Sequence, residues 1–151
     1  SEKQGQFKAS FYAPEERLEE TVAEINQRLS EANVPYQIIS SVDPFTGDGL
    51  IDLLPVGVSK AFALEWLCRK HSVPPRSVIF SGDSGNDIAA FNAGYKTIIV
   101  GNAEASIVEQ VQETHRSAGW PDRLYHSSQH ATSGVLEGVQ YFLRSNNGCL
   151  P

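Results

Sequence analysis

Hydrophobic and polar residues follow two different patterns along the chain, and the change between them falls near residue 55. Before that point, alternation of apolar and polar residues predicts three strands, at 7–12, 36–42 and 50–54. Between the first two strands, apolar residues recur at helical spacing, at Leu18, Val22, Ile25 and Leu29. This β-α-β-β order predicts a small antiparallel sheet with one helix on its face.

After Pro55, short apolar strands alternate with helical patterns. The predicted strands are 77–80, 96–100 and 123–125, and the predicted helices are 58–70, a short helix ending near 93, 104–113 and 132–143. Strands that alternate with helices are typical of a parallel sheet built from βαβ units. The sequence therefore predicts an α/β fold with two parts, an α+β unit at residues 1–55 and a partial Rossmann-like core at residues 56–151.

The turn at residues 81–87, with the sequence Ser-Gly-Asp-Ser-Gly-Asn-Asp, follows a predicted strand and precedes a helix. Open α/β sheets bind ligands outside the carboxyl ends of their strands. Asp83 and Asp87 are four residues apart, so a helical start can bring both carboxylates toward one point, with the Asn86 amide beside them. Carboxylate oxygens suit Mg²⁺. Asp, Ser and Asn are equally favoured at an ordinary helix N-cap, and the spacing alone does not separate the two interpretations.

Lys60 lies in the first turn of the helix predicted after Pro55, where a cation opposes the helix dipole. It is either a solvated surface lysine or a lysine that reaches a phosphate at the edge of the sheet. Asn102 lies in the turn after the strand at 96–100, so we expect it at the same edge as Asp83. An ordinary strand-to-helix turn explains Asn102 as well.

Charge and composition narrow the choice of partners. The chain has a net charge of −6, which disfavours binding to nucleic acid or to an anionic membrane. No apolar run is long enough to span a bilayer. Cys68 and Cys149 form no CxxC pair, and Cys68 has the apolar neighbours of a buried thiol. Because nothing indicates a disulfide framework, we expect a cytoplasmic protein.

Two histidines, His126 and His130, are four residues apart, which on a continuous helix would allow a shared metal ion. Here they flank an expected loop, and no third ligand lies nearby in the sequence. One pair falls short of a zinc ligand set, so the sequence favours the Asp83 region as the metal site.

Taken together, Ser59-Lys60 and the stretch 79–87 resemble the haloacid dehalogenase superfamily, in the branch whose α/β cap is inserted between the second and third motifs. Within that branch the chain is most similar to sucrose-phosphate phosphatases. The strands at 7–12 and 51–55 and the turn at 99–103 extend the resemblance. It implies that residues 1–55 are the later part of the substrate-specificity cap and that residues 56–151 are the C-terminal part of the hydrolase core.

The resemblance also implies an activity: Mg²⁺-dependent hydrolysis of a sugar phosphate, sucrose 6-phosphate above all, through an aspartyl-phosphate. In this interpretation Lys60 neutralises the phosphate, and Asp83 and Asp87 hold Mg²⁺. Asn86, and more weakly Asn102, orient phosphate or metal ligands.

The resemblance implies that the cap supplies sugar contacts, for which Lys8 and Asp52 are candidates. Strand packing or an ordinary surface charge would explain either residue equally well.

One departure from the family pattern concerns the nucleophile. The expected apolar strand ending in Asp-x-Asp is absent, because Asp43 is followed by Pro-Phe, and the Ser or Thr strand of the second motif is absent too. Ala61 also stands where the family usually has Gly. The chain contains no Met. We therefore expect a C-terminal portion of such an enzyme, without turnover by itself.

A half-sheet that lacks its first strand exposes a pairing edge. We expect this edge to pair with the missing N-terminal segment or with a second copy of the chain. The alternative to an enzyme is a non-catalytic, phosphatase-like module that binds a sugar phosphate or regulates a sucrose-phosphate synthase-type partner.

Overall fold

The computed structural model describes residues 5–43 and 46–147. Contacts divide the chain into two units, Ser1–Val58 and Ser59–Pro151, whereas the sequence predicted a division after residue 55. Cys149 and the Pro-Phe pair at positions 44–45 lie outside the described residues.

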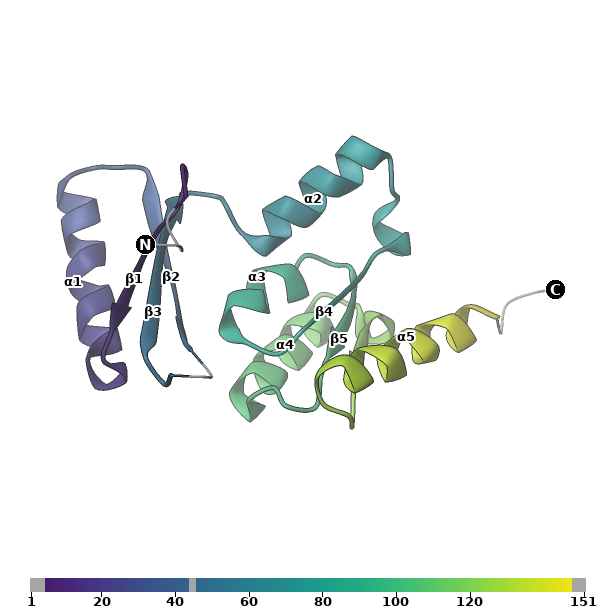
Figure 1. Ribbon diagram of the computed structural model, residues 1–151. Coiled ribbons are helices and arrows are strands. Elements are labelled where there is room, and N and C mark those ends of the chain that lie inside the picture. The colour runs from purple at the N-terminus through teal and green to yellow at the C-terminus, as the bar shows by residue number, and fades with distance from the viewer. Residues whose placement is uncertain (1–4, 44–45, 148–151) are drawn as a thin grey trace. The chain divides into compact units, whose positions relative to one another are not determined.

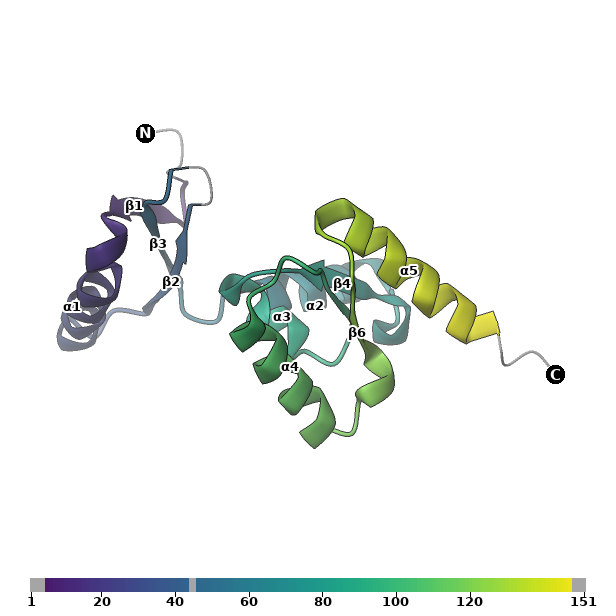
Figure 2. The same ribbon diagram turned by 90° about the horizontal axis from the view of Figure 1, so that it is seen from below.

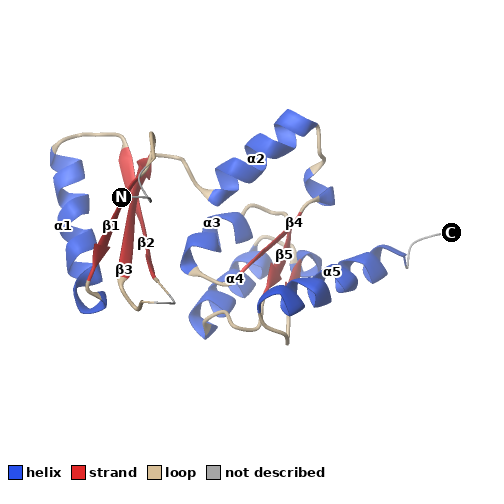
Figure 3. Cartoon of the chain, viewed as in Figure 1, coloured by secondary structure: helices blue, strands red, loops and turns tan. Residues whose placement is uncertain are grey.

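The first unit is a three-stranded antiparallel sheet with one long helix (Figure 3). Its elements are β1 (Ala9–Ala13), a 3-10 turn at Glu15–Arg17, α1 (Leu18–Glu31), β2 (Tyr36–Val42) and β3 (Gly49–Pro55). The strand order is β1-β3-β2, with both pairings antiparallel, so the predicted small sheet is confirmed.

Helix α1 covers one face of this sheet (Figure 1). The four predicted positions, Leu18, Val22, Ile25 and Leu29, are half-buried while most of the helix is exposed. A Cβ on Gly49 would lie 2.8 Å from Leu18 Cδ1, so a glycine lets the helix approach the strand. Ile51, two residues further along the same face, is 1% exposed.

The second unit contains a parallel sheet, as predicted, and its strand order is β4-β5-β6. Its elements are α2 (Lys60–His71), β4 (Ile79–Gly82), α3 (Ile88–Phe91), β5 (Lys96–Ile99), α4 (Ala105–Ser117), β6 (Leu124–His126) and α5 (Ala131–Asn147), with 3-10 turns at Pro75–Ser77, Gly85–Asp87 and Pro121–Arg123. Of the helices in the described ranges, none is long and apolar enough to cross a bilayer.

Helices cover both faces of the parallel sheet, with α5 on one side and α4 on the other (Figure 2). Ile98, Val100 and Phe142 form the core under α5. Phe91, Ile99 and Val111 belong to the core on the opposite face. Burial on both faces explains why Ile98, Ile99 and Val100 are consecutive apolar residues and do not alternate with polar ones. Gly138 brings α5 close to the sheet, since a Cβ there would lie 2.6 Å from Ile98 Cγ1.

Two apolar residues in the predicted helices 58–70 and 132–143 are exposed in the structure. Leu67 is 45% exposed and Leu136 is 59% exposed. In α5 the buried stripe runs through Val135, Val139 and Phe142, and Leu136 is one step further round the helix. Cys68, by contrast, is a buried free thiol as predicted.

Candidate functional site

The candidate site lies at the carboxyl edge of the parallel sheet and is built from residues of the second unit. Asp83 follows β4 and Asn102 follows β5, and Asn102 Nδ2 donates to Asp83 Oδ2 at 2.7 Å. The carboxyl ends of adjacent parallel strands share one edge, and for this reason residues 19 positions apart meet.

Asp87 is the buried member of the site, with its side chain 5% exposed. Its Oδ2 accepts from the backbone N–H of Asp83 at 3.1 Å and of Ser84 at 3.2 Å, and its Oδ1 accepts from the ammonium of Lys60. Ser84 and Asp87 form a capping box at the start of the 3-10 turn. Both carboxylate oxygens of Asp87 therefore accept hydrogen bonds from groups of this chain.

Gly82 gives this carboxylate its place at the end of β4. A Cβ at Gly82 would lie 2.3 Å from Asp87 Oδ2, closer than any real contact. A side chain there would force Asp87 off the backbone groups that it caps.

Lys60 reaches the same turn from the N-terminus of α2. Ser59 caps that helix by accepting from Phe62 N at 3.2 Å. The Lys60 ammonium donates to Asn86 Oδ1 at 2.7 Å as well as to Asp87. Because the carboxylate offsets the unfavourable helix dipole, the cation is stable at this position. The Lys60 side chain remains 48% exposed and can meet a ligand at the edge.

Asp83 is exposed, whereas Asp87 is buried. Across the described ranges Asp83 Oδ2 accepts from Asn102, and Asp83 Oδ1 accepts no hydrogen bond. An exposed carboxylate with an open oxygen fits Mg²⁺, which takes few protein carboxylates and completes its shell with phosphate and water. Within residues 5–43 and 46–147, no group of three or more His, Cys, Asp or Glu could hold a metal by itself.

The loop between β6 and α5, together with the first residue of α5, fixes the position of Asn102. Its Oδ1 accepts from the backbone N–H of Ala131 at 2.8 Å, and the neighbouring Gly101 N–H donates to the carbonyl of Gln129 at 2.8 Å. The Asn102 amide thus bridges the start of α5 to Asp83.

Glu137 holds this loop in place, and the sequence did not indicate it. Its carboxylate accepts from Tyr125 Oη at 2.8 Å, from Gln129 N at 3.1 Å and from Ser127 Oγ. The hydrogen bond from Ser127 is the main cause that lowers the pKa of Glu137 below its ordinary 4.5. The Glu137 carboxylate in turn raises the pKa of Tyr125 above 10.0 by accepting its hydroxyl proton in a hydrogen bond. A glutamate two turns into a helix carries no local signal of such a role.

Four predicted residues remain, His126 and His130 in the second unit and Lys8 and Asp52 in the first. His126 ends β6 and His130 lies just before α5, so they do not share one helix. Lys8 and Asp52 belong to the first unit, where they form an ion pair of 2.7 Å, and Ser10 Oγ donates to Asp52 Oδ1 at 2.6 Å. Strand alternation places Asp52 on the sheet face opposite Ile51, and so opposite α1.

Comparison with solved structures defines the class. The sucrose-phosphatase of Synechocystis sp. PCC6803, solved in complex with sucrose and phosphate, matches with a TM-score of 0.66 and 26% identity. The match covers 92% of this chain and 53% of that one. A haloacid dehalogenase-like hydrolase from B. subtilis shares the fold over 68% of this chain, with a TM-score of 0.51 and 21% identity. The fold is that of the haloacid dehalogenase-like hydrolases.

The chain belongs to the sucrose-6F-phosphate phosphohydrolase family, whose sequence profile matches residues 1–143. Mannosylfructose-phosphate phosphatase of Agrobacterium fabrum is 31% identical over 122 residues, which are 80% of this chain and 44% of that protein. Sucrose-phosphatase 1 of Nicotiana tabacum is 26% identical over 141 residues, 89% of this chain and 31% of that protein. The chain thus spans less than half the length of these curated relatives.

The Glu137 network makes a prediction about pH. The folded-state pKa of Glu137 lies below 4.5, so its contribution to stability is present above pH 4.5 and is lost as pH falls through the folded-state value. We expect Glu137→Gln to unfold at lower urea than the wild type near neutral pH, and the gap to narrow below pH 4.5. Equilibrium unfolding in urea at several pH values measures this difference in stability between the wild type and Glu137→Gln.

The matched control is Glu109→Gln, an exposed position on α4 with the same change of charge. A gap between wild type and Glu137→Gln that stays constant from neutral pH to well below 4.5 would contradict the role assigned to this carboxylate.

Proposed function

We propose that this chain carries the metal- and phosphate-binding part of a Mg²⁺-dependent sugar-phosphate phosphatase. The observation that carries the proposal is the juxtaposition of an open carboxylate, Asp83, with a cation held in place, Lys60, at one sheet edge. Both residues contact the same short turn. The Lys60 ammonium donates to Asn86 and Asp87, and the backbone N–H of Asp83 donates to Asp87.

The proposed roles divide between the two carboxylates. Asp83 offers a ligand to Mg²⁺, with its free Oδ1 available, whereas Asp87 orients Lys60. Bound Mg²⁺ supplies positive charge against a transferring phosphoryl group. Lys60 holds a second positive charge at the same edge, and Asn86 sets the direction in which the ammonium points.

The nucleophile of the proposed reaction lies outside these 151 residues. We propose that an aspartate from such a segment attacks phosphorus, that the P–O bond to the sugar breaks, and that water then releases phosphate from the aspartyl-phosphate. Strand β4 pairs only with β5 among the described residues, which leaves an edge for a further strand. The segment that carries the nucleophile, or a second copy of the chain, is the proposed occupant.

Sucrose 6-phosphate is the proposed substrate. The names of two relatives refer to sucrose phosphate and to mannosylfructose phosphate. On the sheet face opposite α1, Lys8 pairs with Asp52, and buried Ser10 donates to the same carboxylate. The Lys8 side chain is 41% exposed, so its ammonium can also donate to a sugar hydroxyl. The pairing of Lys8 with Asp52 also has a purely structural explanation, since opposite charges on neighbouring strands stabilise a sheet.

A second candidate is a non-catalytic module that binds a sugar phosphate or regulates a synthase-type partner. The absence of an Asp-x-Asp strand from the sequence favours it. Both candidates use the same edge for a metal and a phosphate, so metal binding alone does not separate them.

The division of roles predicts different metal affinities for two variants. We expect Asp83→Asn to weaken Mg²⁺ binding by at least about tenfold, because it removes a direct ligand. Asp87→Asn should weaken it clearly less, since both oxygens of Asp87 already serve the chain. Calorimetric titration with Mg²⁺ measures both, with Asp122→Asn as the charge-matched control. Equal losses at the two positions would count against the assignment.

The missing nucleophile predicts the outcome of an activity assay. The 151-residue chain with Mg²⁺ and sucrose 6-phosphate should release no phosphate above the background, whereas the protein extended by its upstream coding segment should release it. Turnover by the short chain that disappears in Asp83→Asn would place the nucleophile within it and refute this part of the proposal. An extended protein that binds sucrose 6-phosphate without turnover would favour the non-catalytic module.

A further inference from the structure

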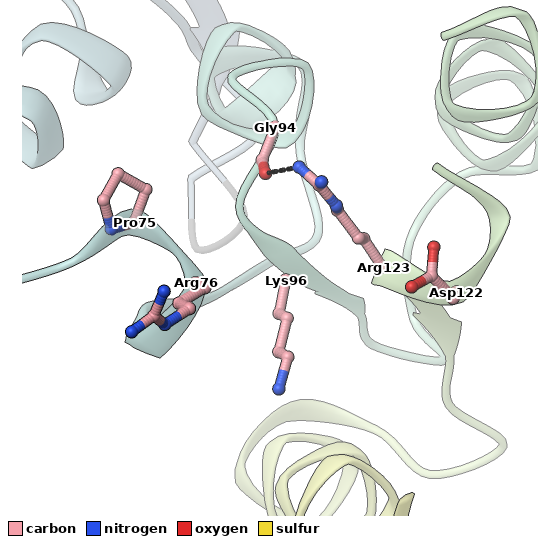
Figure 4. Close-up of a pocket in the computed structure, with 6 residues that line it drawn as sticks. All are labelled: Pro75, Arg76, Gly94, Lys96, Asp122 and Arg123. Carbon is pink, nitrogen blue, oxygen red and sulfur yellow. Dashed lines mark hydrogen bonds between the residues drawn. The ribbon is translucent and has the colours of Figure 1, made fainter. Parts of the chain in front are cut away.

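A basic pocket lies at the amino end of the parallel sheet, the edge opposite Asp83 and Asn102. It has a volume of about 420 Å³ and is lined by Pro75, Arg76, Gly94, Lys96, Asp122 and Arg123 (Figure 4). Each cation stands at the start of a strand: Arg76 precedes β4, Lys96 begins β5 and Arg123 precedes β6. Because β4 spans Ile79–Gly82, roughly 10 Å of strand separates this pocket from the catalytic edge.

The charge around the pocket is opposite to that of the chain. Three cations and one carboxylate line it, while the chain as a whole carries a net charge of −6. In the described part of the chain, Asp122 forms no ion pair with any of the three, and Arg76 has neither a hydrogen bond nor an ion pair. Figure 4 shows the Arg76 and Lys96 side chains extending from neighbouring elements, while the Arg123 side chain, from the turn before β6, extends to the carbonyl of Gly94. Positive charge is therefore concentrated at this pocket, and Arg76 is a cation that has no counter-ion among the described residues.

The structure holds Arg123 in a fixed orientation. Its Nη1 donates to the carbonyl of Gly94 at 2.8 Å, and its guanidinium lies 5.4 Å from the centroid of the Trp120 ring. Gly94 has a φ of 82°, and a Cβ there would lie 3.2 Å from the Trp120 ring, so the turn depends on glycine. Of the five N–H donors of the guanidinium, this arrangement uses one. An arginine already ordered in this way loses little side-chain entropy when it binds an anion.

We propose that this pocket binds the phosphate group of a small metabolite, at a site separate from the catalytic edge. Arg guanidinium groups match phosphate oxygens in two-point geometry, and Lys96 adds a point charge at the same pocket. The volume is within the range of small-molecule sites. Free phosphate and a sugar phosphate present the same group, and a titration with each distinguishes them.

The test is an NMR titration of the ¹⁵N-labelled 151-residue chain with inorganic phosphate and, separately, with glucose 6-phosphate, without Mg²⁺ and at constant ionic strength. We expect saturable shifts at the amides of Arg76, Lys96 and Arg123 with at least one of the two. Tighter binding of glucose 6-phosphate would show that the sugar is also recognised. Lys60→Ala should leave these shifts intact, since it removes only the cation of the catalytic edge.

Arg76→Gln and Arg123→Gln should each weaken binding by about tenfold, as loss of one charged hydrogen bond predicts. Arg116→Gln, an exposed arginine on α4, is the charge-matched control and should bind as the wild type does. Arg76 makes no hydrogen bond or ion pair with the described residues, so its variant carries the test even where Arg123→Gln fails to fold. Shifts that do not saturate with either ligand, that sodium chloride reproduces, or that survive Arg76→Gln unchanged would overturn the proposal.

Discussion

The contact between the Lys60 ammonium and the Asp87 carboxylate is the interaction on which the candidate site depends. Each partner is unfavourable alone: Lys60 is a cation at a helix N-terminus, and Asp87 is a nearly buried carboxylate. Together they offset each other, and the second oxygen of Asp87 closes the turn on the N–H groups of Asp83 and Ser84. The turn that exposes Asp83 is thus held by a residue that does not itself need to touch a ligand.

A second set of contacts holds the other side of the edge. Glu137 on α5 accepts hydrogen bonds from the loop after β6, and the Gly101 N–H donates to a carbonyl of that loop. The first N–H of α5 donates to Asn102, whose amide donates to Asp83. Helix packing at Gly138 therefore bears on the site although it lies within the core. The two sets meet at Asp83, which lies between the Asp87 cap and the Asn102 amide. An exposed carboxylate becomes a defined ligand position because buried neighbours constrain its backbone and its side chain.

Much of the fold was predictable because it follows from periodicity. The α1 stripe, the antiparallel first unit and the parallel sheet of the second unit were all predicted from the pattern of apolar residues. The meeting of Asp83 with Asn102 was predictable too, since parallel strands bring their carboxyl ends to one edge. The exposure of Leu136 was not, because helical spacing defines a stripe only to within one position.

The different roles of Asp83 and Asp87 could not be predicted from their spacing. Four residues place both carboxylates near one point, but burial and the partner Lys60, 27 positions away, decide which one stays open. The sequence did not indicate the roles of Glu137 and Arg123 for the same reason. Their partners are the loop at Ser127–Gln129 and the carbonyl of Gly94, which come within hydrogen-bonding distance only in the folded sheet.

A double-mutant cycle between Lys60 and Asp87 tests the central claim most directly. The free energy of unfolding is measured for the wild type, Lys60→Ala, Asp87→Ala and the double variant, with the exposed pair Arg116 and Glu113 as a control cycle. Because Asp87 is buried while Lys60 is half-exposed, the account predicts a coupling of about 1 kcal/mol, against less than about 0.5 kcal/mol for the control. Losses at Lys60 and Asp87 that add to within about 0.3 kcal/mol would show that the two side chains do not act together and would contradict the account.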